Sequence, residues 1–294
     1  MKVAIIGESG LLGSNLFKYY SKRKFEVKAF SRSNSQNNVF IINFDNLEKS
    51  LSDSFNNWCP DIIINAVALV NLQKCEEDYD NAYYVNTSIA MKLATISKKY
   101  NSYFIHISTD HFFNDKKAKH SENAEVNLLN NYAKTKFDAE NEVLKIYNKS
   151  LIVRTNIIGF RRNDIDSFFE WLLNSLQSKE KTKLFNNFFT SPLSVQQLAK
   201  FLIDCYEIKI NGIYNIASSE VIDKYSFGLR TAKHFGYDER NIDSIKLDKT
   251  INGVDRALSL GLDVSKIENI LDIKMPTIDE TLQELHKEFK EANE

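Results

Sequence analysis

The sequence predicts an α/β fold of the Rossmann type, in which a doubly wound parallel sheet is joined to a smaller C-terminal lobe. Over residues 1–155, short apolar runs rich in β-branched residues alternate with helical patterns, as strands and crossover helices do in parallel sheets. The first run leads directly into three glycines at three-residue spacing, Gly7, Gly10 and Gly13. After Asn156 the alternation loosens into amphipathic helices and short strands, which indicates the lobe.

Apolar periodicity predicts the individual elements in chain order. Strands are expected at residues 2–6, 26–30, 38–43, 61–65, 103–108, 151–155 and 212–217. Helices are expected at residues 11–21, 47–57, 75–86, 87–100, 131–147, 164–178, 194–206 and 278–292. We therefore expect a sheet domain over 1–155, completed by about 187–217, and a lobe made of 156–186 and 218–294.

Charge and composition exclude several classes of protein. The 294 residues carry 38 basic and 39 acidic side chains, so neither nucleic acid nor an anionic membrane surface is expected as a partner. No apolar run approaches the ~20 residues that span a bilayer. The first residues pass directly into a strand, which leaves no room for a signal peptide and predicts a cytoplasmic protein. Cys59, Cys75 and Cys205 have no metal-binding spacing and are expected to be buried thiols.

The glycine turn after the first strand predicts a site for an anion. Backbone N–H groups point outward at a helix N-terminus, and the helix dipole favours negative charge there. Glycines also let a pyrophosphate approach the backbone closely. A strand-to-helix turn without a ligand is the alternative, but one turn rarely needs three glycines. The residues expected at a dinucleotide are Gly7, Ser9, Gly10, Leu11, Leu12 and Gly13.

The end of the second predicted strand favours NADP over NAD. In dinucleotide-binding units, an Asp or Glu about 20 residues beyond the glycines binds the ribose hydroxyls of NAD. Here that place holds Ser31, Arg32 and Ser33, without a carboxylate. A guanidinium and two hydroxyls suit a 2′-phosphate, so we expect NADP (NADPH) as the cofactor. A solvated loop arginine is the alternative.

Two further segments are expected at the cofactor. Asp45 and Asn46 follow the third predicted strand and either reach the adenine edge or cap the next helix. Ala66, Val67 and Ala68 follow the fourth strand, where small residues allow a flat cofactor to lie against the end of the sheet.

Tyr132 and Lys136 form the predicted chemical centre. Their four-residue spacing places both on one face of a helix, about 6 Å apart along its axis. A nearby ammonium favours phenolate and so prepares a tyrosine for proton transfer. Thr109 ends a predicted strand at the edge where ligands of open parallel sheets bind. Its hydroxyl is expected to contact the substrate oxygen with which Tyr132 would exchange a proton. The spacing alone is common in helices; the glycine turn and Ser108-Thr109-Asp110 make coincidence improbable.

The sequence does not assign the histidines a single role. His106 alternates with apolar positions and is expected to be a core or sheet residue. His111 follows the strand end and is expected either to face the substrate or to serve the structure. The remaining histidines have no metal-binding spacing, so no metal site is predicted.

Taken together, these motifs resemble the extended short-chain dehydrogenases/reductases, and within them the dTDP-4-dehydrorhamnose reductase branch. The resemblance covers nearly the whole chain. It is carried by the glycine turn, Asn65-Ala-Val-Ala68, Ser108-Thr-Asp-His-Phe-Phe113, and Tyr132-Ala-Lys-Thr-Lys136 with Glu140. Two later segments also resemble the branch: Asn187-Phe-Phe-Thr-Ser-Pro192 and Gly212-Ile-Tyr-Asn-Ile216.

The resemblance implies a role for each matching residue. Tyr132 would protonate the C4 oxygen of the substrate, Lys136 would lower the tyrosine pKa and bind the nicotinamide ribose, and Thr109 would hold the reacting oxygen. NADPH would deliver hydride to a 4-keto-6-deoxy sugar attached to a nucleotide diphosphate, in surface polysaccharide biosynthesis. The first domain would thus bind NADP and the lobe a nucleotide-sugar substrate. Dimers are common in the family, although no residue here identifies a homodimer.

Substrate contacts are expected from Asp110, His111 and Arg256. The related 4,6-dehydratases carry Glu where this chain has His111, which favours reduction over dehydration. Arg256 is a candidate for the diphosphate, or else forms a structural ion pair. Its segment departs from the branch's Arg-Pro-x-Asn-Ser-x-Leu by lacking the Pro and the Asn. The alternatives are an NAD(P)-dependent sugar-nucleotide epimerase and a non-catalytic NADP-binding regulatory subunit, such as the branch's subunit of methionine adenosyltransferase.

Overall fold

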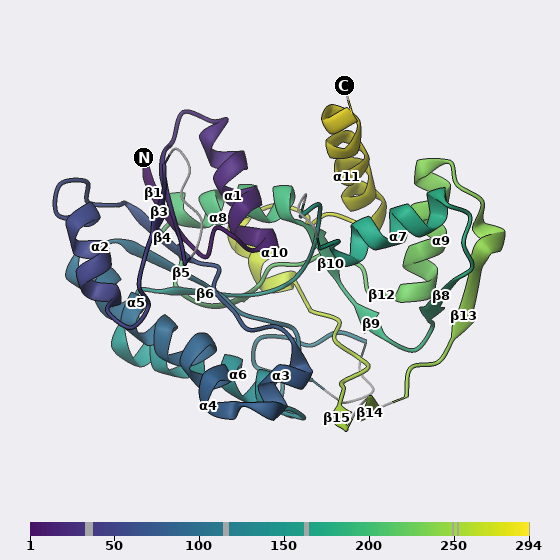
Figure 1. Ribbon diagram of the computed structural model, residues 1–294, viewed down its shortest axis with the longest axis horizontal. Coiled ribbons are helices and arrows are strands. Elements are labelled where there is room, and N and C mark those ends of the chain that lie inside the picture. The colour runs from purple at the N-terminus through teal and green to yellow at the C-terminus, as the bar shows by residue number, and fades with distance from the viewer. Residues whose placement is uncertain (33–37, 114–117, 162–164, 249, 252, 294) are drawn as a thin grey trace. The chain divides into compact units, whose positions relative to one another are not determined.

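The computed structural model describes residues 1–32, 38–113, 118–161, 165–248, 250–251 and 253–293. The chain forms two compact units (Figure 1). The first comprises residues 1–109, 130–153 and 199–214, and the second comprises residues 110–129, 154–198 and 215–294.

A seven-stranded sheet forms the centre of the first unit. Its strand order is β11-β6-β5-β4-β1-β2-β3, and the neighbouring pairs from β6 to β3 are parallel. The order reverses between β1 and β4, as the predicted doubly wound fold requires, so the fold class is confirmed. The strands are β1 (Lys2–Ile6), β2 (Glu26–Ser31), β3 (Val39–Ile41), β4 (Ile62–Asn65), β5 (Tyr103–Ile107), β6 (Leu151–Arg154) and β11 (Gly212–Asn215).

Helices cover both faces of this sheet. Figure 1 shows α2, α5 and α6 on one face and α1 with α8 on the other. The helices are α1 (Leu11–Ser21), α2 (Leu47–Phe55), α3 (Leu72–Glu77), α4 (Tyr79–Tyr83), α5 (Ile89–Lys99), α6 (Asn131–Ile146) and α8 (Val195–Glu207). A π-helix, Tyr84–Ser88, joins α4 to α5. The two uninterrupted helices predicted over 75–100 are therefore wrong in detail, because α-helical periodicity cannot locate a π-turn within a helical run.

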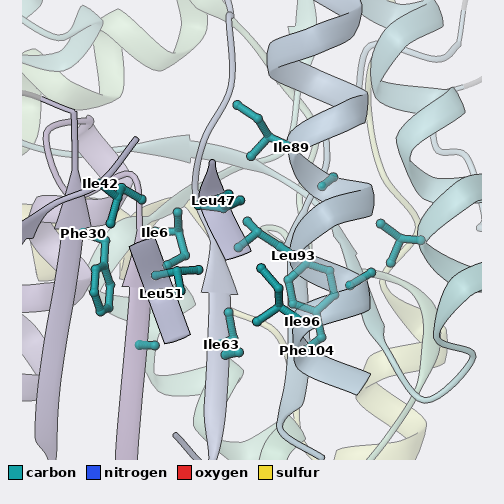
Figure 2. Packing of buried hydrophobic residues seen from close by; sticks show 14 of the residues in the cluster. Ile6, Phe30, Ile42, Leu47, Leu51, Ile63, Ile89, Leu93, Ile96 and Phe104 are labelled. Atoms are coloured by element: carbon teal, nitrogen blue, oxygen red, sulfur yellow. The ribbon is translucent and has the colours of Figure 1, made fainter. Parts of the chain in front are cut away.

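The core of the first unit lies between the sheet and its α2–α5–α6 face. Figure 2 shows Ile6, Phe30, Ile63 and Phe104 of the strands packed against leucines and isoleucines of α2 and α5. These strands are mostly apolar because both faces of a parallel sheet are covered. Cys75 and Cys205 are buried as expected, but Cys59 is exposed. That prediction was wrong because Cys59 occupies the turn after α2, with φ of 43°.

The second unit consists of helices and short strand pairs. Its strands are β7 (Asn156–Ile158), β8 (Thr182–Phe185), β9 (Phe189–Thr190), β10 (Pro192–Ser194), β12 (Ile222–Asp223), β13 (Ile242–Ile245), β14 (Thr250–Ile251) and β15 (Val254–Asp255). Its helices are α7 (Phe168–Gln177), α9 (Lys224–Phe235), a 3-10 turn (Glu239–Asn241), α10 (Ser265–Leu271) and α11 (Ile278–Asn293). A separate core, with members such as Phe169, Phe227 and Leu282, holds α7, α9 and α11 together.

Candidate active site

The glycine turn packs closely against its neighbouring backbone. Gly7 has φ of +98°, and the N–H groups of Gly7 and Glu8 both donate to the carbonyl of Phe30 at the end of β2. A Cβ on Gly13 would lie 2.1 Å from the oxygen of Gly7, so only glycine allows α1 to pack this close to the turn. Gly10 is the N-cap of α1 and offers no side-chain cap. The first N–H groups of α1 are therefore available to an anion.

A cavity of about 640 Å³ lies at this turn. Its volume is within the range of cofactor pockets, and the glycines that line it leave their backbone accessible, so the residues fit a dinucleotide. The lining includes nine of the predicted cofactor residues: Gly7, Ser9, Gly10, Ser31, Arg32, Asp45, Ala66, Val67 and Ala68.

Five other predicted cofactor residues have different positions. Leu12 and Gly13 are buried in the packing of α1, Leu11 begins that helix, and Asn46 is the exposed N-cap of α2. None of these four lines the cavity. Ser33 lies outside the described residues. Cofactor contacts from these five positions stay predictions.

Sequence reasoning missed one wall of the cavity, which comes from α4, the π-helix and α5. Asn81, Tyr84, Val85 and Ile89 contribute to it. The Tyr84 hydroxyl donates to Asp45 Oδ1 at 2.6 Å, and burial together with this carboxylate raises the pKa of Tyr84 to about 12. The hydrogen bond joins residues 39 positions apart, and no local pattern predicts such a contact.

Tyr132 and Lys136 lie on α6, whose N-terminus is capped by Asn130, with the side chain accepting from Ala133 N at 2.9 Å. Tyr132 is 7% exposed and Lys136 only 1%. Lys136 Nζ donates to the carbonyl oxygen of Ile107 at 2.6 Å, at the end of β5. Burial lowers the pKa of Lys136 to about 8, although the carboxylate of Glu140 opposes this shift. The lysine can therefore exchange a proton near neutral pH.

The end of β5 continues into buried polar residues. Ser108 Oγ donates to Glu140 Oε1 at 2.5 Å, which ties the strand end to α6 one turn beyond Lys136. Thr109 follows and is buried in the same unit. The predicted trio of Thr109, Tyr132 and Lys136 thus belongs to one unit with the cofactor cavity.

The π-helix fixes the position of α6. Asn86 Nδ2 donates to Thr135 Oγ1 at 3.0 Å, and Thr87 Oγ1 donates to the Thr135 carbonyl at 2.7 Å. Thr135 lies between Tyr132 and Lys136, so both contacts act on the segment that carries the predicted chemistry. The wider turn of a π-helix places these two consecutive side chains toward α6, a geometry that sequence periodicity does not reveal.

Asp110, His111 and Arg256 belong to the second unit. Asp110 accepts a hydrogen bond from Asn156 Nδ2 at 2.8 Å, and His111 Nε2 lies 3.9 Å from Asp110 Oδ1. Burial raises the pKa of Asp110 and lowers that of His111. The carboxylate of Asp110 opposes the shift at His111, and the positive charges of Arg256 and Lys224 add to it. The structure thus groups Asp110 with His111.

Lys224, at the start of α9, was missed by the sequence analysis. Burial lowers its pKa to about 8, while Asp110 opposes the shift. Its ammonium lies 4.4 Å from the ring centre of Phe168. A lysine after an Asp N-cap looks like an ordinary helix start in sequence, so no signal distinguished it.

The described residues show neither a metal site nor a membrane-spanning helix. No group of three or more His, Cys, Asp and Glu side chains there has the arrangement of a metal site. None of the helices in the described ranges combines the length and the apolar character needed to cross a bilayer.

Comparisons with known proteins agree with this geometry. The chain is 26% identical to a dTDP-4-dehydrorhamnose reductase of Aggregatibacter actinomycetemcomitans over 93% of this chain and 94% of the relative. It is 26% identical to the spore coat polysaccharide biosynthesis protein SpsK of Bacillus subtilis, over 81% of this chain and 80% of the relative. A crystal structure of a dTDP-4-dehydrorhamnose reductase from Clostridium acetobutylicum matches with a TM-score of 0.84 at 25% identity, covering 99% and 100% of the two chains.

A dTDP-4-dehydrorhamnose reductase from Bacillus anthracis, solved in complex with NADP, has the same fold, with a TM-score of 0.86 at 19% identity over 98% and 99% of the chains. The family model described as the RmlD substrate binding domain matches residues 1–291. The match spans both units, so the resemblance inferred from the motifs is confirmed: the chain belongs to the RmlD substrate binding domain family.

Proposed function

We propose that this protein is an NADP-dependent oxidoreductase that reduces the C4 keto group of a nucleotide-diphosphate-linked 4-keto-6-deoxy sugar with NADPH. The observation that carries the proposal is the buried pair of Tyr132 and Lys136 on α6, in the same unit as a dinucleotide-sized cavity at a glycine turn. A tyrosine with a buried lysine one turn away suits proton transfer to a carbonyl oxygen. The family relationship and the reductases among its relatives support this assignment.

One set of residues would bind the cofactor, and another would act on the C4 oxygen of the substrate. Arg32 and Ser31 would hold the 2′-phosphate, and the backbone of the glycine turn would hold the pyrophosphate. When bound, NADPH supplies the hydride for C4. Tyr132 would give its proton to the C4 oxygen, while Thr109 donates a hydrogen bond to that oxygen. Lys136 would orient the ribose and return a proton to Tyr132.

We further propose a role in surface polysaccharide biosynthesis, supported by the name of the relative SpsK. Asp110, His111 and Arg256 would contact the nucleotide sugar. The cluster of Asp110, His111 and nearby positive charges provides hydrogen-bonding and cationic groups that suit a sugar hydroxyl and a phosphate.

A panel of substrates tests the activity. The protein is incubated with NADPH and with dTDP-, GDP-, UDP- or CDP-linked 4-keto-6-deoxy sugars, and NADPH oxidation is followed by absorbance. We expect oxidation with at least one of them and a 4-hydroxy product by NMR. Interconversion of 4-hydroxy sugar nucleotides without net NADPH consumption would instead identify an epimerase. NADPH binding without turnover on any of these compounds would contradict the proposal and favour a regulatory subunit.

Replacing Arg32 tests the cofactor preference. Arg32→Ala is expected to weaken NADPH binding about tenfold or more and NADH binding by much less, because only NADPH carries the 2′-phosphate that the guanidinium would bind. Both affinities are measured by fluorescence titration. Arg23→Ala is the matched control, because Arg23 stacks on Tyr19 and does not line the cavity. Equal losses for both cofactors in the Arg32 variant would contradict the assignment.

A further inference from the structure

Three buried polar side chains lie in a row behind the predicted chemical centre. Asn65 ends β4, His106 is its register partner on β5, and Lys136 projects from α6. Asn65 Nδ2 lies 3.0 Å from His106 Nδ1, and His106 Nε2 lies 3.4 Å from Lys136 Nζ. All three are at most 1% exposed, so their hydrogen bonds are made within the protein.

The backbone fixes the orientation of the Asn65 amide. Its Oδ1 accepts from Val67 N at 3.0 Å, and the opposite orientation would place the NH₂ group against this N–H donor. Nδ2 therefore faces His106, and Nδ2 has only hydrogens to offer. It follows that His106 Nδ1 is an acceptor.

An imidazole that accepts at Nδ1 carries its proton on Nε2 when it is neutral. Burial lowers the pKa of His106 well below its usual value, which is consistent with the neutral ring. The Nε2–H bond is then directed toward Lys136 Nζ. The ordinary role of a core histidine does not explain why a donor should face a lysine.

An ammonium group has only donors, whereas an amine has a lone pair that accepts. Lys136 already donates to the Ile107 carbonyl at 2.6 Å, which either form can do. Only the amine can also accept from His106. We propose that His106, locked by Asn65 as the Nε2–H tautomer, is a positioning residue that favours the amine form of Lys136 in the cofactor-free protein.

Other ionisable groups also act on Lys136. Glu140, one turn along α6, favours the ammonium, and burial disfavours it. Tyr132 lies one turn before Lys136 on the same helix. His106, from β5, faces Nζ from the sheet side. The histidine thus adds to the effect of burial and offsets that of Glu140.

The catalytic consequence rests on the proposed function. After Tyr132 gives its proton to the substrate oxygen, the phenolate must recover a proton. A Lys136 ammonium destabilised by His106 is a stronger acid and transfers a proton to the phenolate more readily. The resulting amine, stabilised by the Nε2–H bond, then takes the next proton from solvent. His106 would therefore assist each turnover without touching the substrate.

NMR on the cofactor-free full-length protein tests the inference without an activity assay. Nitrogen-15-labelled histidine reports the tautomer, and carbon-13-labelled lysine reports the titration of Lys136. His106 signals are identified by their loss in His106→Gln, and Lys136 signals by their loss in Lys136→Met. We expect a neutral Nε2–H ring for His106 and a Lys136 midpoint of about 8. An Nδ1–H or charged ring would overturn the inference.

Two variants then change the donor that faces Lys136. In Asn65→Asp the carboxylate accepts from both Val67 N and Nδ1–H, which leaves Nε2 as an acceptor for the ammonium. In His106→Gln the amide can turn its oxygen toward Nζ. Each is expected to raise the Lys136 midpoint by about one pH unit or more. Unchanged midpoints in both variants would contradict the proposal.

A double variant separates the tautomer from simple charge. The new carboxylate in Asn65→Asp attracts the ammonium whether or not His106 is present. If His106 carries the coupling, most of the Asn65→Asp shift disappears in the His106→Gln background. A shift of equal size in both backgrounds would assign the effect to charge alone and overturn the proposal. If Asn65→Asp does not fold, the wild-type tautomer and the His106→Gln titration still decide.

Discussion

Tyr132→Phe is expected to lower NADPH oxidation about 10²- to 10⁴-fold, the range associated with loss of a general acid. The substitution removes one oxygen from a nearly buried ring and leaves its packing in place. The glycine-turn cavity does not include the Tyr132 ring among its lining residues. NADPH affinity should therefore stay within a few-fold of wild type. Steady-state rates with the best sugar nucleotide and a fluorescence titration of NADPH measure the two effects.

Tyr147→Phe is the matched control for this prediction. Tyr147 is the C-cap of the same helix and equally buried, but it lies fifteen residues beyond Tyr132, about 22 Å along the axis. Its loss of a hydroxyl should leave turnover nearly unchanged. Wild-type turnover in the Tyr132 variant would rule out the proposed mechanism, and a loss of NADPH binding equal to the loss of rate would assign Tyr132 to the cofactor instead.

Local chemistry explains why much of the first unit could be predicted. The run before Gly7 is apolar because both faces of its strand are covered, and glycine is required where φ is +98° and where α1 packs on the turn. The residues that carry these signals all lie within positions 2–13. The sheet and the cavity at the glycine turn could therefore be inferred from this stretch and from the alternating strand and helix patterns that follow it.

Contacts between distant segments could not be predicted in the same way. Tyr84 reaches Asp45, and Asn86 reaches Thr135, and both residues belong to the π-helix. His106 illustrates the limit most clearly. Alternation placed it correctly in the sheet, but its partners Asn65 and Lys136 are 41 and 30 residues away. A side chain's protonation depends on such partners, and residue type alone does not reveal them.

Gly13→Ala is expected to disrupt both folding and cofactor binding. The new methyl group would lie 2.1 Å from the Gly7 oxygen, 2.7 Å from its carbonyl carbon and 2.8 Å from Glu8 Cα. All three are backbone atoms, so α1 or the turn must move. Overpacking of this kind costs about 1–3 kcal/mol, and the better helix propensity of alanine offsets part of that. Because the turn carries Gly7 and Gly10, NADPH affinity should fall about tenfold or more.

Gly10→Ala separates crowding from the general effect of adding a methyl group. Its Cβ would meet the Gly7 oxygen at 3.5 Å, an ordinary contact, and its φ of −85° suits alanine. Urea unfolding should therefore show a much smaller change in the free energy of unfolding than in Gly13→Ala. NADPH affinity is expected to fall in both, because Gly10 lines the cavity. Equal stabilities for the two variants would mean that close approach of α1 to the turn does not determine the need for glycine at position 13.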